Sequence, residues 1–175
     1  DAEVNYVEVS LDSTKPAIHN GFRGTGSWEK TVKGIENVVA QEELEVGIAS
    51  TITQLNLGEL EELIQFSKNI GANKFYAFNF IPSGRGKEVV DLDLTPEQRE
   101  TMLNVLYEHY RKGDMPCMTT CPQFARVCMS ADREHAPTSH YTSARGRMAK
   151  VLAEFIGGCG VGRAYCAIQP DGIVS

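Results

Sequence analysis

Strand-like and helix-like segments alternate three times in the first two-thirds of the chain. The expected strands are rich in β-branched and aromatic residues and span residues 4–10, 45–53 and 74–81. The expected helices, which follow each strand, carry apolar residues at helical spacing and span residues 27–41, 58–70 and 95–111. Repeated strand–helix units predict an α/β fold with a parallel sheet and right-handed crossovers.

Several residues mark where these elements begin and end. Ser27 is expected to cap the first helix. Thr95, with Pro96 after it and Gln98 three residues on, predicts a capping box for the third helix. Gly71 is expected to end the second helix. Residues 113–141 show no such pattern and are expected to form loop or irregular structure.

Composition excludes some classes of protein. The 175 residues carry a formal net charge of −6 and show no basic stripe with interleaved aromatics, which argues against a nucleic-acid surface. No stretch approaches the roughly 18 apolar residues that a membrane span requires. The cysteine count of 5 is odd, and clustered cysteines without a signal peptide favour metal or redox chemistry over a disulfide scaffold. We expect a cytoplasmic protein.

Polar residues gather after each expected strand, where parallel α/β folds place their active sites. The first of these loops suits a ligand with hydroxyl and carboxylate groups, although a role for Asp12 and Ser13 in shaping the turn is equally open. For His19 a local hydrogen bond is favoured over catalysis. The candidates are Ser10, Asp12, Ser13, His19 and Arg23 in the first loop, Thr51, Thr53, Gln54 and Asn56 in the second, and residues 82–87 in the third.

The third loop, Ser83-Gly-Arg85-Gly-Lys87, could hold an anion through backbone N–H groups and its two basic side chains. It lacks the GxxxxGK[ST] spacing of a P-loop. A solvated surface loop is the simpler interpretation, and it is favoured for this segment when it is considered alone.

The cysteines show no standard zinc spacing. Cys117, Cys121 and Cys128 are separated by three and six residues, so loop and core positions are favoured for them. Cys159 and Cys166 are too far apart for a CxxC motif. In an extended segment their odd spacing would put them on opposite faces, which argues against one shared ion.

The segment from Cys159 to Ser175 contains Pro170-Asp-Gly172, a turn signal followed by only three residues. A hairpin would need a longer second strand. We therefore expect this chain to be part of a longer protein.

Four segments together resemble the radical S-adenosylmethionine (SAM) enzymes that carry a SPASM domain. YVEVSLDSTKPAIHNGFRGTGSWEKTVKGI (6–35), TITQLN (51–56) and FYAFNFIPSGRGKE (75–88) are similar to the regions of that family's fourth, fifth and sixth barrel strands. Cys159-x12-Gly172 is similar to the opening of the SPASM motif.

The resemblance implies the C-terminal half of a partial (β/α)6 TIM-like barrel with parallel strands, followed by the start of a SPASM auxiliary-cluster domain. The implied domains are residues 1–112 for the barrel, 113–156 for a cysteine-containing connector and helix, and 157–175 for the beginning of the SPASM domain. The family's CxxxCxxC loop is absent, because position 124 is Phe where Cys117-x3-Cys121 would need a third cysteine. We therefore expect these 175 residues alone to be inactive.

The resemblance also implies cofactors and site residues. A reduced [4Fe–4S] cluster would cleave SAM to a 5'-deoxyadenosyl radical. Ser10 and Arg23 would bind the ribose or the methionine carboxylate of SAM, and Cys159 would ligate an auxiliary [4Fe–4S] cluster. Cys166 has no assigned place in the motif, and packing is favoured over an additional ligand role. The remaining candidates for the SAM site are Asp12, Thr53, Asn56, Ser83 and Arg85.

Three segments are similar in sequence to the tetrapyrrole branch of the family, which serves haem and haem d1 biosynthesis. They are residues 79–88, 121–129 and 162–172. That similarity implies deacetylation or oxidative decarboxylation of tetrapyrrole side chains, with ferredoxin or flavodoxin as electron donor. A polycarboxylate substrate would require positively charged side chains to bind it. For each basic residue taken alone, a solvated surface position is the favoured interpretation. The candidates are Arg85, Lys87, Arg126, Arg145 and Arg163.

Three alternatives stay open. The same scaffold could belong to a peptide-modifying or sulfatase-maturing radical SAM/SPASM enzyme. A non-catalytic binding module of βα type would need no cofactor. An ordinary barrel enzyme could use the loop at 83–87 for a phosphorylated substrate.

Overall fold

The computed structural model describes residues 4–131 together with residues 168, 172 and 173. The chain divides into two compact units, residues 1–121 and residues 122–175. The first unit holds all the strands named below, and the second holds one described helix.

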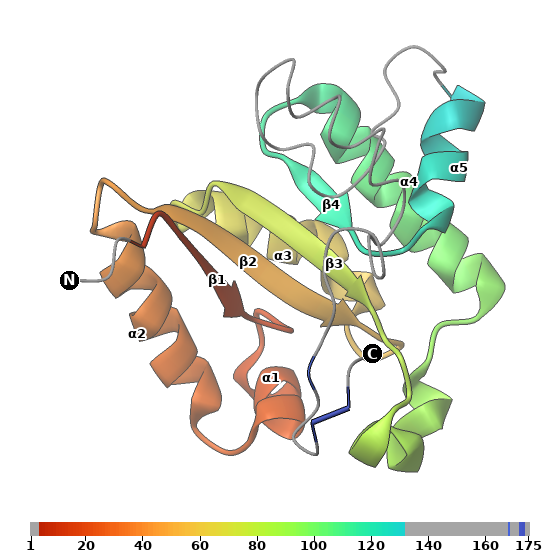
Figure 1. Ribbon diagram of the computed structural model, residues 1–175, viewed down its shortest axis with the longest axis horizontal. Coiled ribbons are helices and arrows are strands. Elements are labelled where there is room, and N and C mark those ends of the chain that lie inside the picture. The colour runs from red at the N-terminus through yellow and green to blue at the C-terminus, as the bar shows by residue number, and fades with distance from the viewer. Residues whose placement is uncertain (1–3, 132–167, 169–171, 174–175) are drawn as a thin grey trace. The chain divides into compact units, whose positions relative to one another are not determined.

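Four parallel strands form one sheet in the first unit. They lie side by side in the order β1-β2-β3-β4, as Figure 1 shows. Because neighbours in the sheet are also consecutive in the chain, right-handed crossovers carry successive helices to the same side. This is the arrangement of a barrel segment, and it confirms the predicted α/β class. The strands are β1 (Tyr6–Ser10), β2 (Glu45–Ile52), β3 (Lys74–Asn79) and β4 (Cys117–Thr119).

Helices connect the strands. α2 packs against β1 and β2, α3 against β3, and α4 against β4. The helical elements are α1 (Pro16–Arg23), α2 (Ser27–Val39), η1 (Leu57–Glu59), α3 (Leu60–Asn69), η2 (Gly84–Leu92), α4 (Pro96–Lys112) and, in the second unit, α5 (Gln123–Ala131), where η marks 3-10 helix.

The sheet buries both of its faces to different degrees. On one face, Ile48 and Phe75 are fully buried, as are Ile35 of α2 and Leu63 of α3, so this face forms the core with the helices. The opposite face carries a row across all four strands, because the register aligns Ser10, Ala49, Tyr76 and Met118. We call this row, with Phe78 beside it, the inner face; Ala49, Tyr76 and Met118 form a buried cluster there, against which Phe78 packs.

The strands, the capping box of α4 and the end of the second helix follow the sequence closely. Thr95 and Gln98 make both hydrogen bonds of the capping box. Gly71 follows α3 with a φ of +95°, the left-handed conformation that favours glycine. The second helix differs slightly, because residues 57–59 form a 3-10 turn before the α-helix begins at Leu60.

Three expectations about local structure are wrong. Ser27 does not cap α2, because it is already the first helical residue and Gly26 occupies the cap position. The loop expected after the first strand contains α1, an eight-residue helix. The region 113–141, expected to be irregular, contains β4 and α5. β4 has only three residues, which is too short for an alternating pattern to be visible.

β4 lies in the first unit, which ends at Cys121. The expected domain boundaries at 112 and 156 stay predictions. No helix within the described part of the chain is long and apolar enough to cross a membrane.

Candidate functional site

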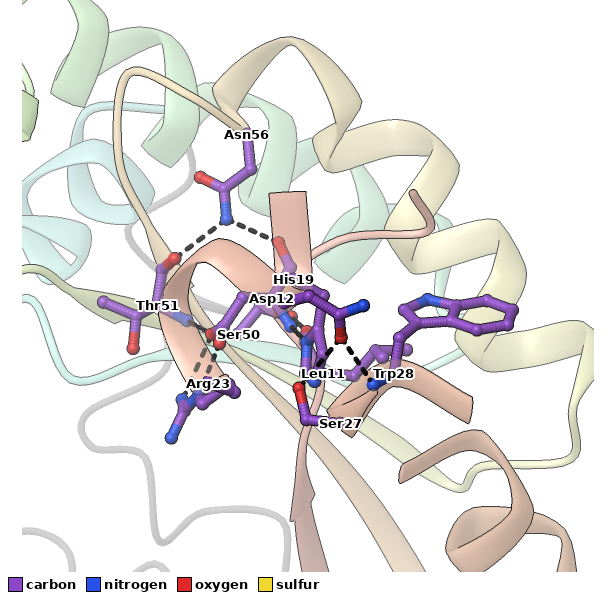
Figure 2. A network of polar contacts seen from close by, with 10 residues as sticks. Leu11, Asp12, His19, Arg23, Ser27, Trp28, Ser50, Thr51 and Asn56 are labelled. Atoms are coloured by element: carbon purple, nitrogen blue, oxygen red, sulfur yellow. Dashed lines mark hydrogen bonds and ion pairs between the residues drawn. The ribbon is translucent and has the colours of Figure 1, made fainter. Parts of the chain in front are cut away.

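Asp12 is the centre of a buried polar network at the carboxyl end of β1. Its side chain is only 1% exposed. Oδ2 accepts a hydrogen bond from Arg23 Nε at 2.6 Å, and Oδ1 accepts from Arg23 Nη2 at 3.2 Å and from the backbone N–H of Thr51 at 2.9 Å. Figure 2 shows these contacts. The carboxylate therefore joins the end of β1 to the end of β2 and to the last residue of α1.

The backbone of Asp12 is fixed as well as its side chain. Its N–H donates to His19 Nδ1 at 3.2 Å, and its carbonyl accepts from Asn56 Nδ2 at 2.6 Å (Figure 2). Both partners are fully buried. The loop after β1 is therefore held from α1 on one side and from the loop after β2 on the other.

His19 is a buried hydrogen-bond acceptor in this network, which agrees with the favoured local role. Because Nδ1 accepts the Asp12 N–H, the neutral ring carries its proton on Nε2. Burial lowers the pKa of His19, and the nearby Arg23 acts in the same direction. Nε2 has no hydrogen-bond partner among the described residues. The imidazole is thus held neutral and in a single tautomer.

Arg23 reaches the surface, with a side chain 41% exposed. Its hydrogen bond to Asp12 raises the pKa of Arg23, so the guanidinium is always charged. Contacts within the described part of the chain use Nε and one hydrogen of Nη2. The other edge of the guanidinium, Nη1 and the second Nη2 hydrogen, can bind a carboxylate with two parallel hydrogen bonds.

Thr53 and Asn56 are fully buried, and their polar groups are used inside the protein. Asn56 Oδ1 accepts from the backbone N–H of Thr53 at 2.7 Å and from Thr53 Oγ1 at 3.3 Å. Asn56 Nδ2 donates to the carbonyls of Asp12 and Thr51. The geometry makes these two residues supports of the strand-end loops.

Ser10 stands apart from this network. It is the exposed last residue of β1 and pairs with Ala49, at the end of the row on the inner face. Ser50, which the sequence did not single out, faces the other way and donates a short hydrogen bond to the Leu11 carbonyl. Of the residues expected in the first loop, Asp12, His19 and Arg23 are therefore brought together, and Ser10 lies on the neighbouring inner face.

The third loop is folded into the 3-10 segment η2. Ser83 precedes it and makes no side-chain cap, and Lys87 within it is exposed. Gly84 takes a φ of +53°, so a left-handed turn opens the segment. Arg85 lies in η2. None of the hydrogen bonds found for the described residues joins this loop to Asp12.

Gln54 ties the second loop to the end of η2, a link that the sequence did not indicate. Its backbone N–H donates to the Leu92 carbonyl, and its side-chain amide donates to the carbonyls of Asp91 and Asp93 at 3.0 and 2.8 Å. The loops after β2 and β3 are therefore fastened to each other.

A second cluster joins the predicted candidate Ser13 to Glu59, a residue that the sequence did not single out. Ser13 Oγ donates to Glu59 Oε2 at 2.5 Å, and Lys15 pairs with Glu59 Oε1 at 2.9 Å. Trp28 Nε1 donates to the Ser13 carbonyl. No short-range sequence signal could have found the Ser13–Glu59 contact, because 46 residues separate its partners.

The three described cysteines do not form a cluster site. Cys117, Cys121 and Cys128 are buried, and burial raises the pKa of Cys117 to about 12 and of Cys128 to about 11. Across the described residues no three His, Cys, Asp or Glu side chains gather as metal ligands.

The remaining candidates lie elsewhere. Arg126 is an exposed residue of α5, in the second unit. Cys159, Cys166, Arg145 and Arg163 lie outside the described residues.

Comparison with known proteins extends over nearly the whole chain. It is 29% identical over 176 residues to the AdoMet-dependent heme synthase of Methanosarcina barkeri, and 28% identical over 177 residues to that of Oleidesulfovibrio alaskensis. The predicted resemblance to radical SAM/SPASM enzymes is confirmed. The chain is also 28% identical over 169 residues to the mycofactocin maturase MftC of Mycobacterium tuberculosis. No protein-family model matches it.

The chain spans less than half the length of these relatives. The aligned region covers 99% of the chain but only 48% and 44% of the two heme synthases, and it covers 96% of the chain but 37% of the maturase.

Proposed function

We propose that this chain belongs to a radical SAM/SPASM enzyme that modifies the side chains of a tetrapyrrole in haem biosynthesis. The observation that carries the proposal is the alignment with AdoMet-dependent heme synthases along 98–99% of the chain. The reaction would be an oxidative decarboxylation or a deacetylation of such side chains.

SAM is the cofactor that the described residues suit. The free edge of the Arg23 guanidinium can receive a carboxylate, and Ser10 offers a hydroxyl on the inner face at the end of β1. In this proposal Arg23 binds the methionine carboxylate of SAM and Ser10 its ribose. Asp12, Thr53 and Asn56 hold the loops that carry these groups.

An iron–sulfur cluster would supply the electron that cleaves SAM. The described cysteines do not suit one, because no three His, Cys, Asp or Glu side chains gather as ligands among the described residues. We propose Cys159 as a ligand of an auxiliary [4Fe–4S] cluster, in a cytoplasmic enzyme reduced by ferredoxin or flavodoxin. We expect the 175 residues alone to cleave no SAM, since they hold no CxxxCxxC motif.

Basic residues outside the SAM site would bind the carboxylates of the tetrapyrrole. Lys87 is exposed in η2, Ser83 precedes it, and Arg85 lies in the same segment. Arg126 of α5, in the second unit, is a separate candidate for a substrate carboxylate. Such cations suit the several carboxylates of a tetrapyrrole.

Anaerobic turnover of the full-length protein tests the proposal. The reduced protein, given SAM and either didecarboxysirohaem or iron-coproporphyrin, should form 5'-deoxyadenosine together with a modified porphyrinoid. A variant Arg23→Gln should lose this activity, whereas Arg111→Gln, which removes an exposed cation paired with Glu108 on α4, should keep it.

A peptide-modifying enzyme is the second candidate, favoured by the alignment of 96% of the chain with mycofactocin maturase MftC. Formation of 5'-deoxyadenosine with a peptide, and with neither porphyrinoid, would favour that candidate and contradict the tetrapyrrole proposal.

A further inference from the structure

We infer that Asp12 is a positioning residue that aims Arg23 at a ligand carboxylate, and that Asp12 does not itself touch the ligand. The inference rests on the proposed function and deepens it. The sequence made Asp12 a candidate for direct contact with SAM, whereas the structure gives its carboxylate to other protein groups.

The exposures of the two partners differ sharply. The Asp12 side chain is 1% exposed and that of Arg23 is 41% exposed. In an ordinary surface ion pair both groups would be hydrated and mobile. Here the carboxylate is the buried anchor, and the guanidinium is the group presented to the outside.

The anchor itself cannot turn freely. Oδ1 is shared between the Thr51 N–H and Arg23 Nη2, and Oδ2 accepts from Arg23 Nε. The backbone on either side of the Asp12 side chain is held by His19 and by Asn56. The orientation of the carboxylate is therefore fixed by groups from α1, β2 and the loop after β2.

A guanidinium is planar, so fixing one of its edges also fixes the direction of the other. Asp12 takes the edge formed by Nε and Nη2. The opposite edge is left to bind a second carboxylate, with little side-chain entropy still to be lost on binding. Lysine could supply the positive charge at position 23, but its ammonium group could not bind two carboxylates along two fixed edges.

A double-variant cycle in the full-length holoprotein tests the inference. SAM affinity is measured for the unaltered protein, Asp12→Asn, Arg23→Gln and the double variant. We expect each single change to weaken binding by about 10-fold or more, the range of a hydrogen-bonded charge. If Asp12 acts only through Arg23, the double variant binds SAM within about 2-fold of Arg23→Gln. Losses that multiply in the double variant would overturn the inference.

The matched control is Glu36→Gln, the same carboxylate-to-amide change in the exposed pair of Glu36 with Lys33, which should leave SAM affinity unchanged. If Asp12→Asn does not fold, Arg23→Lys takes its place. It should lose nearly as much affinity as Arg23→Gln, and unaltered affinity would overturn the inference. Absence of SAM binding by the unaltered protein would instead contradict the proposed function itself.

Discussion

At the scale of single residues, burial favours the neutral form of His19 and one hydrogen bond fixes its tautomer. Nδ1 accepts the Asp12 N–H, and a protonated imidazole could not do so. Burial lowers the pKa of His19; Arg23 lowers it further, and the carboxylates of Asp12 and Glu29 oppose the shift. The folded protein therefore resists a proton that the unfolded chain accepts at a pKa of about 6.5.

This lowered pKa makes folding stability depend on pH. Above about pH 6.5 His19 is neutral in both the folded and the unfolded protein, so its titration takes nothing from the free energy of unfolding. Below that pH the unfolded state gains a proton first, and the free energy of unfolding falls by up to about 1.4 kcal/mol per pH unit. Urea unfolding at pH 7.5 and 5.5 measures the fall, which should be smaller in His19→Gln. An equal fall in both proteins would contradict the role of His19.

Gly47 makes room for the ring of Tyr6 on the sheet. A Cβ atom at position 47 would lie 2.0 Å from Tyr6 Oη. The ring is held there by a hydrogen bond to Glu8 and by the ammonium group of Lys74, 5.1 Å from the ring centroid. Gly47→Ala should therefore destabilise the protein by about 1–3 kcal/mol, although alanine otherwise suits a strand better than glycine.

The control for this change is Gly34→Ala in α2, where an added Cβ meets nothing within 4 Å. It should stabilise the helix by about 0.5–1 kcal/mol. Urea unfolding of both variants, and of Gly47→Ala in a Tyr6→Ala background, gives the comparison. If Gly47→Ala is as harmful without the Tyr6 ring as with it, the steric explanation is wrong.

At the scale of elements, two helix starts differ in how visible they are in the sequence. The capping box of α4 lies within four consecutive residues, Thr95 to Gln98, and was predicted correctly. α2 has no side-chain cap of its own at Gly26. Asn20, near the end of α1, accepts hydrogen bonds from the Trp28 N–H at 2.9 Å and from Ser27 Oγ at 3.0 Å.

Asn20→Ala should destabilise the protein by about 1 kcal/mol, because it leaves the Trp28 N–H at the start of α2 without its acceptor. Asn37→Ala makes the same chemical change at an exposed position inside α2, where alanine is the better helix former. Denaturant midpoints of the two variants give the measurement. An equal effect at both positions would show that Asn20 is not a cap.

The same contrast explains what could be predicted from the sequence. Periodicity and local caps revealed β1, β2, β3 and α4, since their signals lie within a few residues. The Asp12 network was only partly predicted. Their positions after the strands made Asp12, Arg23 and Asn56 candidate site residues. The hydrogen bond between Asp12 and Thr51, however, spans 39 residues and depends on strand register. For that reason the sequence did not predict the hydrogen bonds that Asp12 makes with Thr51 and Asn56 inside the protein.

At the scale of the whole molecule, the division after Cys121 places two buried thiols in different units. Cys117 lies in β4 of the first unit, and Cys128 lies in α5 of the second. Burial raises the pKa of Cys117 to about 12 and of Cys128 to about 11, so little thiolate exists at pH 8 in the folded protein. After unfolding the pKa returns to about 8.5 and alkylation becomes fast.

Each thiol therefore reports the opening of its own unit. The first unit contains the four-stranded sheet and the core of β2 and β3, so we expect Cys117 to stay protected to a higher denaturant concentration than Cys128. Pulsed iodoacetamide labelling of the full-length protein, followed by mass spectrometry of the two cysteine peptides, measures both midpoints. Gly47→Ala, which disturbs only the sheet, should lower the midpoint of Cys117 and leave that of Cys128 in place. Coincident midpoints in both proteins would mean that the two units unfold as one, because a shared transition cannot expose one thiol before the other.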